Sequence, residues 1–399
     1  MQREYDVVIW GATGFTGKLV TRYMKQNYLG GNLKWAVAGR DSSKLAELGI
    51  PETNRLLANS NDKESIDALV QKARVILTTV GPYARYGRSL VEACATQGTH
   101  YCDLTGEVYW MREMIEAFAS TAKESGARIV HTCGFDSIPS DLGAYFLQKE
   151  MIGRYGIPSN HIKYRTVAFK GGFSGGTADS MIAMMENAEN DPNVLEIGKD
   201  PYALNFESRG PDGQDVATAF YDDDFDAWVG PFMMAQINTR VVRRTNELLN
   251  FRYGKDFRYD EGTLVGRGSG AYLGANAVAL GMKATNGLSG FKPTRKLLQK
   301  IIPKPGEGPT EEIIQTGFFT IELIAKHPFE AEKNLKARVT GDQDPGYGST
   351  AKMLAESALA LAQDDLPVEG GFWTPASAMG EALLKRLPMN AGVNFSLID

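Results

Sequence analysis

The sequence predicts an α/β protein in which a Rossmann-type, doubly wound parallel sheet is followed by a second, α+β domain. Three observations support this prediction. A glycine-rich turn follows the first strand-like run, short apolar runs alternate with helix-like segments over the first third of the chain, and longer strand-like runs then replace this alternation. We expect residues 1–145 to form the first domain, residues 146–345 the second, and residues 346–399 to form helices that pack back on the first domain.

The first domain alternates two kinds of segment in the way that βαβ units do. The strand-like runs cover residues 5–10, 34–40, 54–60, 74–80, 100–105 and 127–133. The helix-like segments between them cover residues 17–27, 42–48, 64–73, 87–98 and 110–126. Several of the strand-like runs are almost continuously apolar, which is typical of parallel strands that are covered on both faces.

The second domain is predicted from longer strand-like runs at residues 161–169, 237–245 and 316–327. We expect the last of these to pair with residues 332–341. After it, residues 349–362 have apolar positions at helical spacing, which need a partner surface.

The composition is that of an ordinary globular protein, with 43% hydrophobic and 23% charged residues. Acids and bases are interspersed, and the net charge of -5 offers no basic footprint for nucleic acid. The three cysteines and four histidines have no disulfide or zinc spacing, so we expect free thiols and no metal site. The early first strand leaves no room for a signal peptide, and no run reaches the roughly 18 apolar residues of a membrane span. We therefore expect a cytoplasmic protein.

The opening turn reads GATGFTG and places Gly11, Gly14 and Gly17 between a strand-like and a helix-like run. Glycines at such positions let backbone N–H groups approach a pyrophosphate held at the N-terminus of a helix. The order of strand, turn and helix strengthens the motif. We therefore predict a dinucleotide site at this turn.

Arg40 ends the second predicted strand, 40 − 17 = 23 positions after Gly17. A site for NAD would place an acidic residue about 20 residues past the motif, on the ribose hydroxyls. An arginine instead offers a guanidinium fork to a 2′-phosphate and stacks on adenine. We therefore predict NADP(H) as the cofactor, and we expect Asp41 to cap the following helix.

Three later turns, at residues 80–87, 102–107 and 133–143, follow predicted strands. Ligands of open parallel sheets bind outside the carboxyl ends of the strands, so these turns are expected to face the cofactor. The predicted cofactor-binding residues are Gly11, Thr13, Gly14, Phe15, Thr16, Gly17, Arg40, Gly81, Pro82, Tyr83, Thr105 and Gly106.

Several of these motifs together resemble the saccharopine dehydrogenase-like oxidoreductase family, and more closely its branch of trans-acting enoyl reductases. The resemblance lies in GATGFTG, AGR, GPY, YCDLTGE and CGFDSIPSDLG, and it continues in GGFSGGTADSM, GPFMMAQINTRVVRR, PGEGPTEE and GGFWTPASAMGEALLKRL. It covers nearly the whole chain. The resemblance implies an NADP-binding Rossmann domain, a mixed second domain and reduction of an unsaturated, lipid-type substrate.

We therefore expect an NADPH-dependent oxidoreductase that reduces the C=C (enoyl) bond of a small lipid or acyl-thioester substrate. Two alternatives stay open. One is a saccharopine-type dehydrogenase that acts on a C–N bond, and the other is a non-catalytic, lipid-associated protein that binds NADP(H).

Enoyl reduction requires a hydride for the β-carbon, donors for the developing enolate oxygen and a proton for the α-carbon. Tyr83 is the first candidate donor because it follows a Gly-Pro turn at a strand end, and Asp136 is the second. The alternatives are a Tyr83 ring that only packs, and an Asp136 that only belongs to the capped start of a helix.

Two charged segments have two interpretations each. Arg240, Arg243 and Arg244 could anchor the phosphates of a carrier arm, but as strand positions they are expected on a solvated face. The acidic run at residues 221–228 lacks the calcium-loop pattern, so we expect a solvated turn there and not a metal site.

The segment 269–292 is rich in glycine and alanine and follows Arg267. Its glycines disfavour an isolated helix, and it is too polar and too often interrupted to span a membrane. It could rest on a membrane as a peripheral contact or line an acyl channel. Burial in a homodimer interface or in the core is the favoured interpretation.

Overall fold

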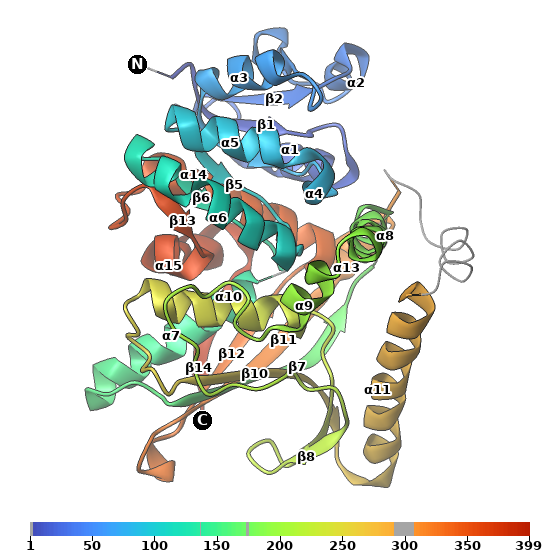
Figure 1. Cartoon of the computed structure of the whole chain (residues 1–399), viewed down its shortest axis with the longest axis vertical. Coiled ribbons are helices and arrows are strands. Elements are labelled where there is room, and N and C mark those ends of the chain that lie inside the picture. The colour runs from blue at the N-terminus through green and yellow to red at the C-terminus, as the bar shows by residue number, and fades with distance from the viewer. Residues whose placement is uncertain (1–2, 136, 173–174, 291–306) are drawn as a thin grey trace.

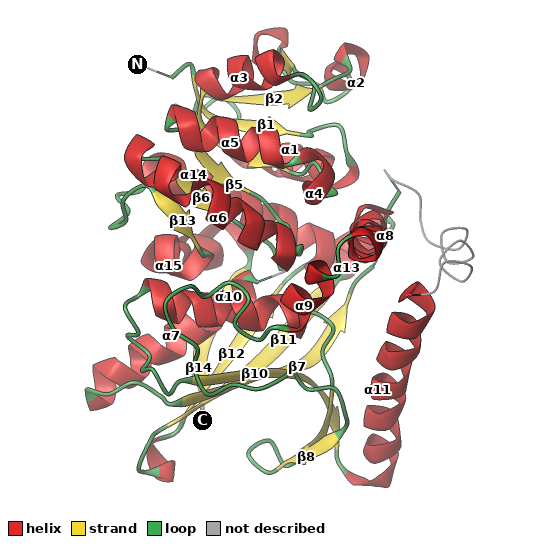
Figure 2. Ribbon diagram, in the orientation of Figure 1, coloured by secondary structure: helices red, strands yellow, loops and turns green. Residues whose placement is uncertain are grey.

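The computed structural model describes residues 3–135, 137–172, 175–290 and 307–399. Within them the chain forms two seven-stranded sheets, which follow one another along the long axis of the molecule. Helices lie between and around the sheets (Figure 1, Figure 2). Together the two sheets confirm the predicted α/β fold with a second, mixed domain.

The first sheet has the strand order β13-β6-β5-β4-β1-β2-β3, and its neighbouring strands are parallel. The strands are β1 (Tyr5–Trp10), β2 (Trp35–Gly39), β3 (Arg55–Leu57), β4 (Ala73–Thr78), β5 (His100–Cys102), β6 (Arg128–Val130) and β13 (Gly371–Trp373). From β1 the following strands are added towards one edge of the sheet, and from β4 they are added towards the other edge. The strand order therefore reverses between β1 and β4, and the carboxyl ends of these two strands form the expected ligand crevice. The predicted doubly wound sheet is therefore confirmed.

Helices cover both faces of this sheet. They are α1 (Phe15–Tyr28), α2 (Ser42–Ala46), α3 (Lys63–Lys72), α4 (Tyr83–Tyr86), α5 (Arg88–Gln97), α6 (Val108–Ser125) and α14 (Thr350–Gln363). In β1, Val7 and Ile9 pack into the core that α1 and α14 cover, whereas Val8 packs into the core under α3, α5 and α6. Burial on both faces explains why this strand is almost continuously apolar.

The second sheet is mixed, with the order β14-β12-β11-β7-β10-β9-β8. Its strands are β7 (His161–Lys170), β8 (Phe220–Asp222), β9 (Ala227–Gly230), β10 (Arg258–Gly266), β11 (Phe318–Lys326), β12 (Leu335–Gly341) and β14 (Val393–Ile398). Strands β7 and β10 are parallel, and the other pairs are antiparallel. The pairing of β11 with β12 confirms the pairing predicted from the sequence.

The remaining helices link or flank the two sheets. They are α7 (Ile138–Tyr155), α8 (Gly175–Asn190), α9 (Asn193–Lys199), α10 (Ala235–Leu248), α11 (Gly268–Gly290), α13 (Glu311–Thr316) and α15 (Pro375–Arg386). Helix α7 packs on β11 and β12, α10 packs on β10, and α15 packs on both α7 and α14. These three helices lie between the sheets (Figure 2).

The C-terminal part of the chain contributes to both sheets. Helix α14 packs against α1, β4 and β5, and β13 then pairs with β6 at the edge of the first sheet. After α15, β14 pairs with β12 at the edge of the second sheet. The final residues therefore join the two sheets by strand pairing as well as by helix packing.

The arginines of the run 237–245 lie on a helix and not on a strand, because this run belongs to α10. Their spacing of three and four residues fits one helix face. Arg240 forms an ion pair with Asp215, Arg243 forms one with Asp212 at 2.7 Å, and Arg244 donates to a main-chain carbonyl at 2.6 Å. All three side chains are buried. The predicted strand and the predicted solvated face are both wrong, because these cations hold the segment between α9 and β8.

The acidic run 221–228 forms the hairpin between β8 and β9, and the expected solvated turn is wrong for Asp222. Its buried carboxylate accepts hydrogen bonds from Arg165 at 2.6 Å and from Lys163 at 2.8 Å. Over the described part of the chain, no group of three or more His, Cys, Asp or Glu side chains is placed to hold a metal ion.

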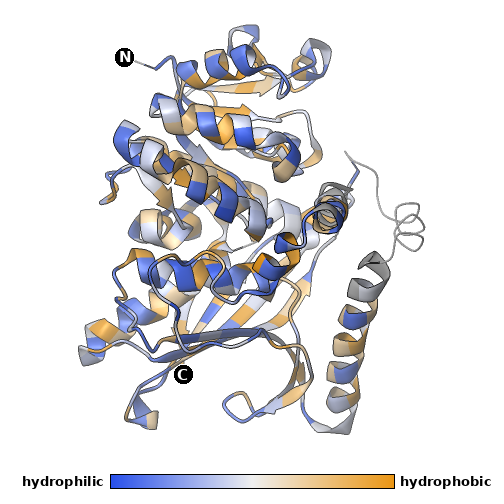
Figure 3. Cartoon of the chain, in the orientation of Figure 1, coloured by the Kyte–Doolittle hydropathy of each residue, from blue (hydrophilic) through white to orange (hydrophobic). Residues whose placement is uncertain are grey.

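Helix α11 is a continuous helix despite its glycines, and it lies outside the body of the molecule (Figure 1). It contacts β9, β10 and α8 through a narrow strip in which Ala275 and Ala279 are buried. Hydrophobic and hydrophilic residues alternate along it (Figure 3). The favoured burial in the core of this chain is therefore wrong for most of the helix, while the last residues of the predicted segment lie outside the described ones.

No helix among the described residues combines the length and the apolarity that crossing a bilayer requires.

Candidate cofactor and active site

The glycine-rich turn between β1 and α1 is closely packed against its own backbone. Gly11 has φ of +84°, and a Cβ there would lie 2.6 Å from a methyl carbon of Val80. A Cβ on Gly17 would overlap with the carbonyl oxygen of Gly11. At Gly14 the corresponding distance to that oxygen is 3.3 Å, which is tight but not overlapping. Side chains are therefore excluded most strongly at Gly11 and Gly17.

The N-terminus of α1 has no side-chain cap. Its N-cap residue, Gly14, has no side chain to cap the helix, and the first intrahelical bond runs from Lys18 N–H to Gly14 at 2.9 Å. The amides of the first turn thus have no partner within the helix. These amides and the absent side chains of the turn fit the pyrophosphate of a dinucleotide.

Arg40 follows β2 at the carboxyl edge of the sheet and is exposed. Thr13 reaches towards the same place, because its hydroxyl lies 3.7 Å from the position of a Cβ on Gly39. The neighbouring Asp41 caps α2 by accepting a hydrogen bond from Lys44 N–H at 3.1 Å. The predicted cap is therefore confirmed, and the Asp41 carboxylate is engaged with the helix.

Loops of the second domain cover the glycine turn. The ring of Phe15 lies edge-on to that of Tyr347, with 5.3 Å between the ring centroids, and Gly308 lies directly against Phe15. A salt bridge of 2.9 Å joins Arg22 of α1 to Glu311 of α13. The position of the cofactor turn is thus set by contacts from both domains.

Asp344 is the centre of these covering loops. Its buried carboxylate accepts the backbone N–H groups of Gly172 at 2.8 Å and Tyr347 at 2.7 Å. Burial raises the pKa of Asp344, while these backbone hydrogen bonds act in the opposite direction. The contact joins the end of β7 to the turn that precedes α14.

The Gly81-Pro82 turn after β4 is held by Glu107. The carboxylate of Glu107 accepts the backbone N–H groups of Tyr83 and Ala84, both at 2.9 Å. Burial raises the pKa of Glu107, and the hydrogen bonds of these amides and of the Ser180 hydroxyl lower it. Glu107, which is distant from α4 in the sequence, therefore caps that helix and links the Gly81-Pro82 turn to α8.

The side chain of Tyr83 is 4% exposed and packs against Trp110 with 5.5 Å between the ring centroids. Its hydroxyl donates to the carbonyl of Thr78 at 3.2 Å and accepts Leu104 N–H at 3.4 Å. The ring thus bridges the ends of β4 and β5.

The turn after β5 is organised by Asp103. Its carboxylate accepts hydrogen bonds from Tyr101 O–H at 2.8 Å and Thr105 N–H at 3.1 Å, and it contacts His131 at 2.7 Å. Next along the chain, Gly106 lies against Ile237 of α10, which a Cβ would approach to 2.8 Å. Thr105 and Gly106 are therefore placed where the first domain meets α10.

Asp136 lies outside the described residues. Its neighbour Ser137 caps α7 by position, yet its hydroxyl makes no capping bond and donates instead to Asn238 of α10 at 3.2 Å. Cys102 and Cys133, close to the ends of β5 and β6, are buried, and the Cys133 thiol donates to the carbonyl of Val130 at 3.7 Å.

The structure brings most of the predicted residues to one edge of the first sheet, but several supporting residues were not predicted. Asp103, Glu107 and Asp344 hold the turns, and sequence reasoning assigned none of them a role. Asp344 alone had a signal, since Asp before Pro-Gly is typical of a turn in which the carboxylate accepts backbone N–H groups.

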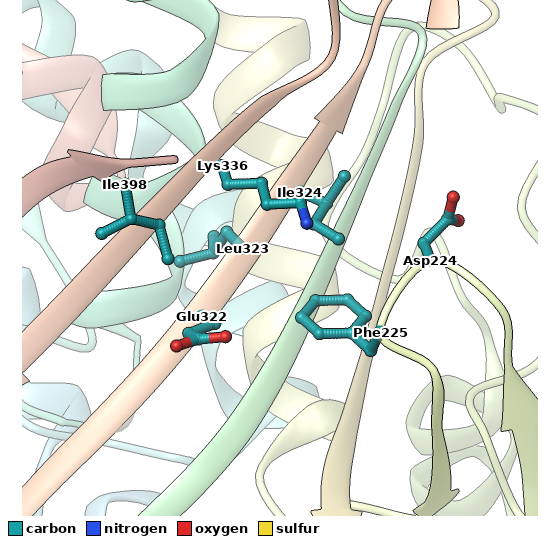
Figure 4. Close-up of a pocket in the computed structure, with 7 residues that line it drawn as sticks. All are labelled: Asp224, Phe225, Glu322, Leu323, Ile324, Lys336 and Ile398. Atoms are coloured by element: carbon teal, nitrogen blue, oxygen red, sulfur yellow. The ribbon is translucent and has the colours of Figure 1, made fainter. Parts of the chain in front are cut away.

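A separate hollow of about 100 Å³ lies on the second sheet (Figure 4). The residues that line it come from β11, β12, β14 and the hairpin between β8 and β9: Asp224, Phe225, Glu322, Leu323, Ile324, Lys336 and Ile398. It therefore does not belong to the crevice at the carboxyl ends of the first sheet.

The parallel sheet, the glycine turn and the arginine after β2 have the pattern of a dinucleotide-binding protein of the Rossmann type. The pattern of the saccharopine dehydrogenase NADP binding domain matches residues 7–130. The apo saccharopine dehydrogenase (L-Glu forming) of Saccharomyces cerevisiae shares the fold, with a TM-score of 0.53 at 11% identity, over 98% of this chain and 99% of that one.

Relatives at higher identity define the family. A trans-acting enoyl reductase of Mycobacterium tuberculosis is 37% identical over 98% of this chain and 97% of its own, and one of Mycobacterium leprae is 37% identical with the same coverage. The chain belongs to the trans-acting enoyl reductase family. It is an NADP-dependent oxidoreductase, and its cofactor is NADP(H).

Proposed function

We propose that this protein uses NADPH to reduce the C=C bond of an enoyl substrate carried on an acyl thioester or lipid. The observation that carries the proposal is the glycine cradle at the N-terminus of α1, in a chain whose full length matches trans-acting enoyl reductases. In this reaction the bound nicotinamide supplies a hydride to the β-carbon of the substrate. The chain must orient the two partners, exclude water and provide the proton for the α-carbon.

The cofactor is assigned to the strand ends of the first sheet. The amides at Phe15, Thr16 and Gly17 would bind the pyrophosphate, and Arg40 would bind the 2′-phosphate. The Gly81-Pro82 turn and the Thr105-Gly106 turn would lie beside the remainder of the dinucleotide, near the nicotinamide.

The proposed reaction is tested by following NADPH absorbance across a panel of enoyl thioesters, ketones and imines. We expect oxidation of NADPH with the enoyl thioesters. Turnover with an amino acid and a keto acid would instead favour a saccharopine-type dehydrogenase. Tight NADPH binding without oxidation against any of these compounds would favour a non-catalytic, nucleotide-binding protein.

Tyr83 and Asp136 stay the candidate proton donors. Replacing Tyr83 with phenylalanine is expected to lower turnover and to leave NADPH affinity nearly unchanged, because the substitution removes only the hydroxyl. Steady-state kinetics and calorimetric titration with NADPH measure the two quantities. An unchanged rate would leave Tyr83 with the packing role that its contacts with Trp110 already provide.

We also propose that α11 rests on a lipid surface that presents the substrate. Tyr272, Leu273 and Leu280 are 45%, 67% and 69% exposed, and no acidic residue occurs from Gly262 to Gly290. An exposed apolar row without negative charge suits the interface of an anionic membrane.

Replacing Leu273 and Leu280 with aspartate is expected to reduce co-sedimentation with vesicles of phosphatidylglycerol several-fold, because the carboxylates oppose both apolar insertion and charge attraction. Leu195→Asp, at an exposed position of α9, is the control. If the double variant instead changed the mass in solution without changing sedimentation, α11 would be a homodimer contact.

A further inference from the structure

A chain of buried polar groups runs from the second sheet to the start of α7. Glu261 of β10 is 1% exposed, and its carboxyl accepts hydrogen bonds from Tyr259 O–H at 2.8 Å and from the Asn238 amide at 3.0 Å. The side-chain oxygen Oδ1 of Asn238 in turn accepts a hydrogen bond from the Ser137 hydroxyl at 3.2 Å. Ser137 and Asn238 are as deeply buried as Glu261. Three elements are thus joined by side chains that solvent does not reach.

The end of this chain lies at the candidate active site. Ser137 immediately follows the turn after β6, whose carboxyl end belongs to the ligand edge of the first sheet. A serine at the N-cap ordinarily accepts a backbone N–H of its own helix, but the Ser137 hydroxyl makes no such bond. Its orientation is set by Asn238 instead, and therefore by a residue of the second domain.

The surroundings of Glu261 favour a neutral carboxyl. The groups that face it are Tyr259 on its own strand, Tyr164 on β7, Ser140 on α7, Asn238 on α10 and, farther away, Asp215, which Arg240 neutralises. None of these groups is a cation in direct contact. Burial raises the pKa of Glu261 to about 7, while the neighbouring side chains of Ser140, Tyr259 and Asn238 act in the opposite direction.

The Ser140 hydroxyl oxygen is buried and makes no hydrogen bond among the described residues, so it is available as an acceptor for a protonated Glu261 carboxyl. Ser140 is buried, and its oxygen lies beside both Glu261 and Tyr259. A neutral carboxyl donates one hydrogen bond while it accepts others, whereas an ionised carboxyl only accepts. Ionisation would therefore leave a buried negative charge without a cation and would change the orientation of the groups around it.

We propose that Glu261 is a positioning residue whose neutral carboxyl fixes Asn238, and through it Ser137 and the turn after β6, in the geometry that the reaction requires. This inference rests on the proposed reductase function. Glu261 touches neither cofactor nor substrate in this role. Its ionisation loosens the turn, so turnover is lost as the pH rises.

The sign of the pH effect follows from the active form. The protonated carboxyl is active, so kcat/KM with an enoyl thioester is expected to be constant below a pH of about 6 and to fall by about tenfold per pH unit well above about 7. Glu261→Gln keeps a neutral group that both donates and accepts. We expect this variant to stay within about twofold of the wild-type rate at pH 6 and to lose the alkaline decline.

Two further variants distinguish a positioning role of Glu261 from a general loss of folded protein. Glu261→Ala removes the partner of Asn238 and is expected to lower kcat at every pH, with an unchanged calorimetric affinity for NADPH. Glu332→Gln, at an exposed position, should reproduce the wild-type pH profile. An alkaline decline that persists in Glu261→Gln would overturn the proposal.

Infrared difference spectroscopy of wild type minus Glu261→Gln provides a readout that does not require turnover. We expect the carbonyl stretch of a protonated carboxylic acid at pH 6, and its loss as the pH rises through about 7. Absence of this band at pH 6 would overturn the proposal on its own. If no enoyl substrate is turned over by the wild type, the reductase assignment fails, and the infrared result then decides separately whether Glu261 is neutral.

Discussion

Replacing Gly17 with alanine is expected to lower NADPH affinity by about 100-fold or more, which corresponds to about 2.7 kcal/mol of binding free energy. The new Cβ would overlap with the Gly11 carbonyl oxygen, a backbone atom that cannot move unless the whole turn moves. The turn would then no longer present its amides to the pyrophosphate. Isothermal titration calorimetry with NADPH measures the loss.

The same motif provides a matched control. At Gly14 the added Cβ would lie 3.3 Å from the same oxygen, so Gly14→Ala is expected to cost much less affinity. Gly153→Ala, in α7 where nothing lies near the added carbon, should leave binding unchanged. If Gly14→Ala and Gly17→Ala lowered NADPH affinity equally, the close packing of Gly17 on the Gly11 carbonyl would not be what shapes the pyrophosphate site. Far-ultraviolet circular dichroism of each variant separates lost binding from lost fold.

Replacing Arg40 with alanine is expected to weaken NADPH binding by about tenfold or more and to leave NADH binding nearly unchanged. The guanidinium would lose a charge-assisted contact that only the 2′-phosphate can make. Paired titrations with the two nucleotides measure the preference directly.

Lys44→Ala is the control for this second substitution, because Lys44 is an exposed cation on the adjacent helix α2. It removes the same net charge without removing the fork at the strand end. We expect Lys44→Ala to keep the preference for NADPH. Wild-type protein that binds NADPH and NADH equally would reject the assignment of Arg40.

The first sheet could be predicted because its local patterns and its tertiary environment agree. Runs such as 74–80 are apolar on both faces, and the parallel sheet buries both faces. The strand β13 could not be predicted in this way. Its three residues, Gly371–Trp373, are too short to show a period, and their partner β6 lies far away in sequence.

The largest error concerned the period of the run 237–245. Its valines and threonines favour a strand, yet the three arginines lie at helical spacing on α10, where Arg240 and Arg243 pair with Asp215 and Asp212. Tertiary contacts, above all the acids at 212 and 215, outweigh the local preference. Those acids lie more than twenty residues away from the arginines, in a segment without regular structure. The local sequence pattern therefore does not show that they pair with the helix.

In the candidate site too, features that depend on neighbouring residues could be predicted, and features that depend on distant residues could not. The glycine turn could be predicted because its chemistry is local, and the Asp41 cap could be predicted for the same reason. The roles of Glu107 and Asp103 could not, since the amides that they bind belong to other strand ends. The catalytic assignment of Tyr83 stays a prediction.

The placement of β13 and β14 has a consequence for how the protein is made. A nascent chain that has left the ribosome only as far as residue 345 exposes the unpaired margin of β6 in one sheet and of β12 in the other. The first sheet cannot be completed until Gly371–Trp373 are translated, nor the second until Val393–Ile398 are translated. Truncation before Gly371 therefore leaves β6 and β12 as unpaired edge strands. We expect such edges to pair between molecules and to cause aggregation.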